Sequence, residues 1–449
     1  AEMTQLTKRP PNILMVVADD HRHDCLHGDR INGPATPTLD ALAKRGTKFC
    51  GARIMGGDTG AVCVPSRAAL QTGCGSRRAL ANPLSDIVSE RHRINADRTL
   101  LGEAFKAAGY RTHAVGKWHN DPASLNRGFE SGSALFLGGM SQHENPPLHE
   151  YDSRGEYPAT NAVNTPGFST ELFADASIKF IEESNHGTAP FLLYCAFTSP
   201  HDPRTPPNDF RQRYRDQDIK LPENFMRSHP FDNGELGGRD EQLALLPRDP
   251  DVTRRHRGDY YGMIEHHDHH FGRMVLALER TGQLENTVIV YVSDHGLALG
   301  SHGLMGKQNL YEHSVRVPLI MSGPRIPTGR IVADDVYSFR LFATLCDLAN
   351  VPTPVSVEEP GLVPLWEEEE DVAHAPQYHF THYCDFQRAV KDQRWKLITY
   401  QVNGTVREQL FDLIKDPHEL NDLSGHPAFA AHQLRLAEVL ENWEIAVSL

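Results

Sequence analysis

A cysteine, a proline and an arginine lie within five residues of one another in this chain, at Cys63, Pro65 and Arg67. The residues that follow, Ala68–Gly73, begin with good helix formers and end at a glycine, so we expect a helix that starts at the cysteine. Proline is tolerated in the first helical turn, where a missing N–H costs no hydrogen bond. The thiol would then lie at a helix N-terminus, where free N–H groups favour negative charge, with Arg67 one turn further on. The pattern predicts a site that could hold an anion.

Two pairs of possible metal ligands directly follow apolar runs that are typical of buried strands. They are Asp19-Asp20 and Asp294-His295. Adjacent carboxylates repel each other unless a cation compensates them, so a hard metal explains them better than a simple turn once the second pair is found. Three carboxylates and one imidazole form a mainly oxygen donor set. Such a set favours calcium or magnesium over zinc, although histidine is an unusual ligand for either.

Basic side chains occur in three further segments, which contain Lys117 with His119, His201, and Lys307. The first two of these segments directly follow predicted strands, as the two pairs of possible metal ligands do. Because ligands bind beyond the carboxyl ends of parallel strands, we expect these four loops to converge on one edge of a sheet.

Strands and helices alternate along most of the chain, which predicts an α/β domain with a mostly parallel central sheet flanked by helices. A segment rich in proline and glutamate, 351–370, reads as a linker or an exposed loop. Short strand-like runs and a helix follow it, so we expect a catalytic domain over 1–355 and a smaller domain over 356–449 with an antiparallel sheet. The predicted strands are 13–18, 111–115, 191–197, 287–292 and 317–322, then 377–381, 388–391, 396–400 and 408–413; the predicted helices are 38–46, 99–109, 169–183, 257–281 and 428–446.

The composition excludes several classes of function. The chain has 449 residues and a net charge of −14, which argues against a nucleic-acid binder and means that an anionic substrate needs a local basic pocket. No apolar run approaches membrane-spanning length, so we expect a soluble protein. Its seven cysteines, scattered and odd in number, form no disulfide framework. The compartment stays open between the cytoplasm and a periplasmic or secreted location with the signal peptide removed.

The segment 63–73 resembles the signature of the formylglycine-dependent sulfatases, within the alkaline phosphatase superfamily. Other segments match the family in the same order: Gly116–His119, Ser199–Pro203, Gly306-Lys307, and the C-terminal Leu410–Leu413 with Asp416–Asn421. The resemblance implies an alkaline-phosphatase-like fold. It also implies that Cys63 is oxidised to formylglycine by a formylglycine-generating or sulfatase-maturing enzyme, and that its hydrate is the nucleophile.

The resemblance assigns roles to the motif residues. One divalent cation, usually calcium, is bound by Asp19, Asp20, Asp294, His295 and the oxygen of the modified residue 63; some family members have asparagine at the position of His295. Lys117, His201 and Lys307 bind the sulfate or the leaving oxygen, and His119 contacts the nucleophile. We place Arg67 with these catalytic residues.

The expected reaction is hydrolysis of a sulfate ester to an alcohol and inorganic sulfate. Lys117, Lys307 and the metal spread the charge on the sulfate oxygens, while His201 or Lys307 protonates the leaving alcohol. The remaining hydroxyl of the hydrate then expels sulfate, with His119 as the base. A sugar sulfate or polysaccharide fragment is the expected substrate; a small alkyl or aryl sulfate remains an alternative.

Two other functions remain open. One is a phosphonate monoester hydrolase or phosphodiesterase of the same superfamily, and the other is a sulfated-glycan binder that does not catalyse. The sequence leaves the oligomeric state open, as well as the choice between chain ends and internal positions of a glycan.

Two more features complete the analysis. The long loops 137–165 and 201–251 are expected to shape the pocket. The cluster His266–His270 lies inside a predicted helix, so its side chains point in several directions, and we expect a structural or surface role rather than a metal site.

Overall fold

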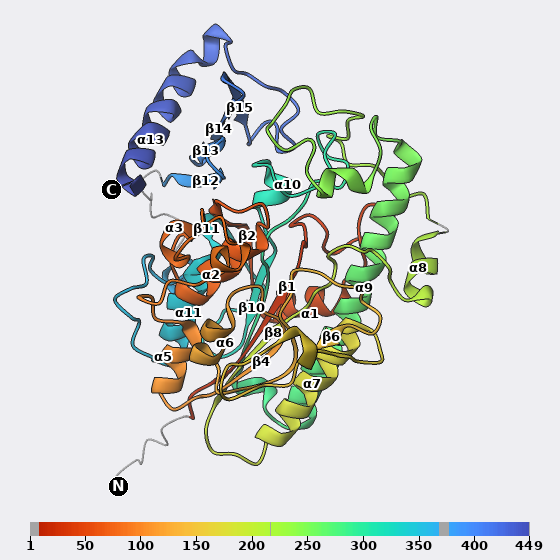
Figure 1. Cartoon of the computed structure of the whole chain (residues 1–449), viewed down its shortest axis with the longest axis vertical. Coiled ribbons are helices and arrows are strands. Elements are labelled where there is room, and N and C mark those ends of the chain that lie inside the picture. Colours follow the sequence, from red (N-terminus) through yellow and green to blue (C-terminus); the bar gives the residue numbers. More distant parts are fainter. Residues whose placement is uncertain (1–8, 216, 368–376, 449) are drawn as a thin grey trace.

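An eight-stranded sheet runs through the centre of the molecule in the computed structural model, which describes residues 9–215, 217–367 and 377–448 (Figure 1). Seven strands point the same way, and β10 runs antiparallel to both of its neighbours. In their order across the sheet, the strands are β11 (Arg330–Tyr337), β2 (Thr47–Arg53), β10 (Leu319–Ser322), β9 (Thr287–Ser293), β1 (Asn12–Ala18), β8 (Phe191–Ala196), β4 (Arg111–Lys117) and β5 (Ser131–Phe136).

The central strand β1 is buried along its whole length because both of its faces are covered. Side chains alternate between the faces of a strand, so Ile13, Met15 and Val17 enter one hydrophobic core while Leu14 and Val16 enter another. This is the reason why the sequence of β1 is a continuous apolar run rather than an alternating one.

Helices form a layer on each face of the sheet (Figure 1). The core on the first face contains residues of α2 (Cys63–Thr72), α5 (Leu101–Ala107), α6 (Pro122–Gly128) and α11 (Leu341–Ala349). The core on the second face contains residues of α1 (Pro37–Arg45), α7 (Ser169–Ser184) and α9 (Pro250–Arg280). Shorter elements lie between them: α3 (Ser76–Ala79), α4 (Val88–Arg91), α8 (Asn208–Arg215), α10 (Glu312–Val315), α12 (Val363–Glu367), and a pair of strands β6 (Pro147–Leu148) and β7 (Val163–Asn164).

A second sheet is built mainly from the C-terminal part of the chain, and α13 (Ala430–Ser448) packs against it. Its order is β15 (Thr405–Asp412), β14 (Trp395–Val402), β13 (Gln387–Lys391), β12 (His379–Tyr383) and β3 (Gly56–Gly57). The first four strands are antiparallel neighbours, whereas β3 comes from the segment just before α2 and pairs parallel with β12. Gly56 has φ +83°, and a Cβ there would lie 2.0 Å from the carbonyl oxygen of His382, so this pairing requires glycine.

Buried charged side chains also connect the two sheets. Arg53, at the end of β2, pairs with Glu312 at 3.0 Å, and Lys396 of β14 pairs with the same carboxylate at 3.0 Å. Lys396 reaches Glu419 at 2.9 Å as well, and each of these four side chains is at most 7% exposed. The C-terminal sheet is therefore joined to the core by ion pairs as well as by β3.

The α/β fold with a small antiparallel sheet confirms the prediction of fold class. Each predicted strand and helix has a counterpart within a few residues. The largest shift is that of α9, which begins seven residues before the predicted start. Three strands of the large sheet were not predicted: β2, β5 and β11. Their sequences contain lysine, glycine, serine or aspartate in place of a long apolar run. Residues 368–370 of the predicted linker lie outside the described residues, and the division of the chain at residue 355 stays a prediction. No helix in the described ranges is long and apolar enough to cross a membrane.

Candidate active site

The loops predicted to converge do meet at the carboxyl ends of the central strands. Asp19 and Asp20 follow β1, and Asp294 follows β9, which pairs with β1. Lys117 is the last residue of β4, and His201 lies beyond the end of β8. Gly116 has φ +87°, and a Cβ there would lie 2.0 Å from the carbonyl oxygen of Ala196, so only glycine lets β4 and β8 pair closely beside Lys117.

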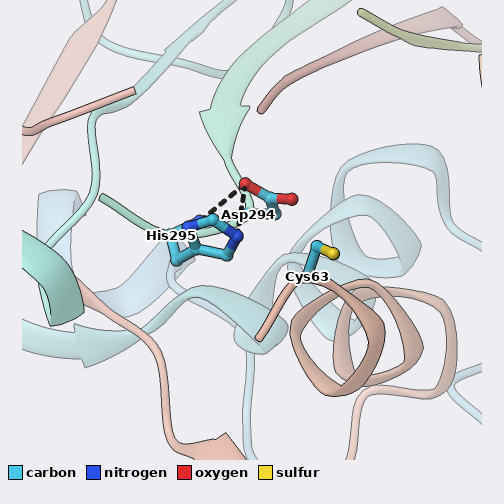
Figure 2. Close-up of side chains that lie close together, drawn as sticks. All are labelled: Cys63, Asp294 and His295. Carbon is cyan, nitrogen blue, oxygen red and sulfur yellow. Dashed lines mark hydrogen bonds and ion pairs between the residues drawn. The ribbon is translucent and has the colours of Figure 1, made fainter. Parts of the chain in front are cut away.

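Cys63 is the first residue of α2 and lies close to Asp294 and His295 (Figure 2). Its Sγ is 2.9 Å from Nδ1 of His119, and the residue is 2% exposed. Burial alone would raise the pKa of the Cys63 thiol, but the neighbouring His119 and Lys117 hold that pKa well below its usual value. The surroundings of position 63 therefore favour a negatively charged group, as the helix N-terminus predicted.

Four buried side chains next to Cys63 form a set of metal-ligand type: Asp19, Asp20, Asp294 and His295. Their donor atoms lie within 4.8 Å of one another, and none of the four is more than 2% exposed. Among the described residues, Oδ1 of Asp19 and Nε2 of His295 have no hydrogen-bond partner although they are buried. Unpartnered buried acceptors are costly, and three carboxylates with one imidazole suit a hard divalent cation, so the residues fit such an ion.

The electrostatics of this set are strongly coupled. Burial raises the pKa of Asp294, in spite of the neighbouring His295. For His295, burial lowers the pKa, but the carboxylate of Asp294 outweighs burial and raises it to about 9. Burial would also raise the pKa of Asp19, yet Lys117, His201 and Arg67 hold it well below its usual value.

Three buried cations surround the carboxylates. Nζ of Lys117 is 2.5 Å from Oδ2 of Asp19, and Nζ of Lys307 is 2.8 Å from Oδ1 of Asp20. The guanidinium of Arg67 is 3.1 Å from Oδ2 of Asp294 and 3.8 Å from Oδ2 of Asp19. Arg67 thus lies behind the carboxylates, at 1% exposure, whereas Lys307 also lines an open pocket.

That pocket has a volume of about 300 Å³ and leads to Cys63. His201 lies on its wall, with Nδ1 held 2.7 Å from the carbonyl oxygen of Asp202 and 3.3 Å from its carboxylate. The two long loops contribute part of the wall, through Gly139 and Met140 from one and Glu235, Arg239 and Asp240 from the other, as expected from their length. The lining residues are Gly60, Ala61, Cys63, His119, Gly139, Met140, His201, Glu235, Arg239, Asp240, Lys307 and Gln308.

The structure brings together every site residue that the sequence singled out. Sequence reasoning missed four polar residues of the outer pocket wall: Glu235, Arg239 and Asp240, which no motif marks, and Gln308, which directly follows the motif Gly306-Lys307. For the first three, the long loop 201–251 was the only signal. In α9, His266 and His270 contact each other at 3.0 Å, while His267 hydrogen bonds to Tyr291 at 2.7 Å; they are buried within the protein, which agrees with a structural role.

Comparison with known proteins decides the family, because the sequence model of the sulfatase family matches residues 11–351. The chain belongs to the sulfatase family. It is therefore a sulfuric ester hydrolase that acts on sulfated substrates. A second family model, described as the C-terminal part of N-sulphoglucosamine sulphohydrolase, matches residues 300–445.

Two similar proteins of the family are named for different sulfated substrates. An arylsulfatase of Clostridium perfringens is 30% identical, over 92% of this chain and 90% of the relative. An N-acetylglucosamine-6-O-sulfatase of Bacteroides thetaiotaomicron is 26% identical, over 97% of this chain and 86% of the relative.

Solved structures confirm the alkaline-phosphatase-like fold. A protein in complex with its substrate D-glucosamine-2-N,6-O-disulfate has a TM-score of 0.78 and 23% identity, covering 98% of both chains. The phosphonate monoester hydrolase of Agrobacterium radiobacter has a TM-score of 0.74 and 23% identity, covering 97% of this chain and 96% of its own. At this identity the likeness shows the fold and not the substrate.

Proposed function

We propose that this sulfatase removes a sulfate group from a sugar or a glycan fragment, with a formylglycine at position 63 as the source of the nucleophile and one divalent cation, most simply Ca²⁺, beside it. The observation that carries the proposal is the arrangement around Cys63. A single small pocket leads to a position that is surrounded by His119, by Lys307 and by the carboxylate set.

In this proposal the pocket residues divide the work between the two halves of the reaction. The ammonium groups of Lys117 and Lys307 bind the sulfate oxygens and stabilise the charge that builds up as sulfur is attacked. His201 projects from the pocket wall with Nδ1 held by Asp202, which leaves Nε2 to donate a proton to the leaving alcohol. His119, 2.9 Å from the side chain at position 63, takes a proton from the second hydroxyl so that sulfate is released.

The proposed metal site consists of Asp19, Asp20, Asp294 and His295. A divalent cation bound there would supply positive charge next to position 63 and lower the pKa of a hydroxyl on it. Arg67 would fix the orientation of Asp294 from behind, through its contact at 3.1 Å. Calcium accepts such an oxygen-dominated set readily, and magnesium is the alternative.

Formylglycine at position 63 requires a partner enzyme during biosynthesis, a formylglycine-generating or sulfatase-maturing enzyme. Because Cys63 is 2% exposed in the folded protein, that enzyme would have to act before the chain closes around the thiol. The second hydroxyl of a hydrated aldehyde explains why an unmodified thiol would not suffice, since a sulfated thiol has no second hydroxyl with which to expel sulfate.

A sugar sulfate is the substrate class that the comparisons support best. One relative is named for N-acetylglucosamine 6-O-sulfate, and a protein of the same fold was solved with a sulfated glucosamine as its substrate. The outer wall of the pocket offers carboxylate, guanidinium and amide groups, which suit the hydroxyl groups of a sugar.

A phosphonate monoester hydrolase is the second candidate, because enzymes of that activity share the fold. Side-by-side assays decide between the two: an aryl sulfate, an aryl phosphonate and an aryl phosphodiester with the same leaving group, at equal enzyme concentration. We expect the highest kcat/KM for the sulfate; a higher value for the phosphonate would refute the proposal.

Intact-mass analysis of the peptide that contains position 63 tests the modification separately. Conversion of the thiol to the aldehyde lowers the mass by about 18 Da, whereas other oxidised forms of cysteine gain mass. An unmodified cysteine in fully active protein would contradict the proposed nucleophile. An unmodified cysteine in inactive protein that still binds sulfated glycans would favour a non-catalytic binder.

A further inference from the structure

The pocket changes its electrostatic character between its inner end and its mouth. The inner end has Lys307 and the two histidines at positions 119 and 201, which suit one anionic group. The outer wall contains Glu235, Arg239 and Asp240, two carboxylates against one guanidinium. The part of the substrate that meets this outer wall is the alcohol that leaves, since sulfate occupies the inner end.

Arg239 already pairs with two protein carboxylates, although its side chain is 51% exposed. Its guanidinium donates to both carboxylate oxygens of Asp202 and to Oδ1 of Asp240, the last at 2.6 Å. Asp202 also lies 3.3 Å from His201, and Asp240 also accepts a hydrogen bond from Gln308 at 2.9 Å. With two carboxylates bound to one guanidinium, these three side chains carry a net charge of −1, which Lys307 partly offsets at Asp240.

Glu235 is the pocket carboxylate without an ion-pair partner among residues 9–215, 217–367 and 377–448. It is half-buried, and burial raises its pKa in spite of a hydrogen bond from Tyr383 that lowers it, with a smaller upward contribution from the negative charge of Asp240. A half-buried carboxylate next to a like charge is stabilised by any donor or cation that enters the pocket and is destabilised by another anion.

We propose that Glu235 determines the specificity of the pocket for the leaving alcohol, favouring substrates with an amine or free hydroxyls next to the scissile sulfate and rejecting those with a second sulfate or a carboxylate there. This inference rests on the proposed function, because it assigns the inner end of the pocket to the sulfate that is removed. The predicted substrate class is a monosulfated sugar that is neutral or basic apart from that sulfate.

The test uses three aryl sulfates that differ at one ring position, where they carry an aminomethyl, a hydroxymethyl or a carboxyl group. Values of kcat/KM are compared between the wild-type holoenzyme and Glu235→Gln, which removes the charge and keeps the shape. For each substrate, the kcat/KM of the wild type is divided by that of Glu235→Gln, which cancels differences in leaving-group reactivity between the substrates. Glu285→Gln is the matched control, because Glu285 is 92% exposed and lies just before the amino end of β9, whereas the pocket lies at the carboxyl ends of the strands.

The wild-type kcat/KM divided by the Glu235→Gln value should fall from the aminomethyl to the hydroxymethyl to the carboxyl substrate. In Glu235→Gln the preference for the aminomethyl over the carboxyl substrate should shrink about tenfold, as for one charge pair in a partly screened site. The hydroxymethyl substrate and all ratios in Glu285→Gln should stay unchanged. Competitive inhibition by the three phenols should show the same order, which measures binding independently of turnover.

Unchanged preference in a folded Glu235→Gln protein would overturn the inference, as would tighter inhibition of the wild type by the carboxyl phenol than by the aminomethyl phenol, which would show that Arg239 accepts a second anion. In both of these outcomes the hydroxymethyl sulfate is still hydrolysed, so the proposed function survives. Failure of the modified, metal-loaded enzyme to hydrolyse any of the three sulfates would instead remove the proposed function and this inference together.

Discussion

Acidification from about pH 7.5 to 5.5 should destabilise this protein, because its fold buries many neutral histidines. Among the histidines that are at most 6% exposed, burial lowers the pKa of six to about 3 or 4. A histidine with a lowered folded pKa contributes stability that is present above its unfolded pKa and is lost as the pH falls below it. The six are His21, His143, His266, His302, His379 and His382.

The size of the effect follows from proton linkage. With an unfolded pKa of about 6.5, each such histidine costs slightly over 1 kcal/mol across this interval, or about 8 kcal/mol for the six. Two buried acids act in the opposite direction, since burial raises the pKa of Asp268 and of Glu419 to about 7. A raised acid pKa destabilises the fold as the pH rises, so these two regain about 4 kcal/mol on acidification, and the eight groups together lose about 4 kcal/mol.

Such a loss is a large part of the roughly 5–15 kcal/mol by which proteins are stable. For 449 residues it corresponds to a fall in melting temperature of about 4 °C. Thermal and denaturant unfolding at both pH values measure it. Glu419→Gln removes one of the two acids that regain stability on acidification, so it should enlarge the fall in melting temperature between pH 7.5 and 5.5. Glu285→Gln should leave that fall unchanged. A melting temperature at pH 5.5 that equals or exceeds the value at 7.5 would refute the reasoning.

Four further predictions concern the site and the join between the sheets. Cys63→Ser should accept a sulfuryl group and fail to release it, seen as a stable mass increase without steady-state turnover; full turnover contradicts the hydrate mechanism. Lys117→Ala and His119→Ala should each lower kcat of the folded protein about 10²-fold or more, with the folded fraction checked by thermal unfolding, and an unchanged kcat in both would remove their roles. Chelation of divalent metal should abolish hydrolysis and added Ca²⁺ should restore it; activity that survives exhaustive chelation argues against the metal site. Glu312→Gln should lower the free energy of unfolding by about 3–5 kcal/mol, because it leaves the buried Arg53 and Lys396 with one carboxylate fewer, and a loss below that of Glu285→Gln would show that the network contributes little.

The sequence predicted the central strands because burial on both faces leaves a plain mark, a continuous apolar run such as that of β1. The residues at the ends of those runs were predicted to meet for the same reason, since parallel strands bring their carboxyl ends to one edge. Strands near the sheet edges carry no such mark. The edge strand β11 contains two adjacent aspartates and a bulge, and β5 begins with serine and glycine.

Most of the outer pocket wall could not be predicted, because Glu235, Arg239 and Asp240 belong to a long loop whose path is set by tertiary contacts. Arg239 is held there by Asp202, which lies 37 positions earlier in the chain. The contact of Arg67 with Asp294 could be predicted only in part. Helical spacing placed Arg67 near Cys63, but Asp294, to which it donates, lies 227 positions away in the chain. Contacts of this kind depend on the fold as a whole and leave no local pattern.

The pairing of Gly56–Gly57 with β12 sets an order of assembly for the molecule. The stretch of chain that leads into the nucleophile-bearing helix can acquire its neighbouring strand only after residue 383 has been synthesised. A ribosome-bound chain that stopped earlier would leave this stretch unpaired, so the reactive position would be completed among the last parts of the protein. Fragments that end ahead of β12 should therefore lack a finished catalytic centre, even if their large sheet has formed.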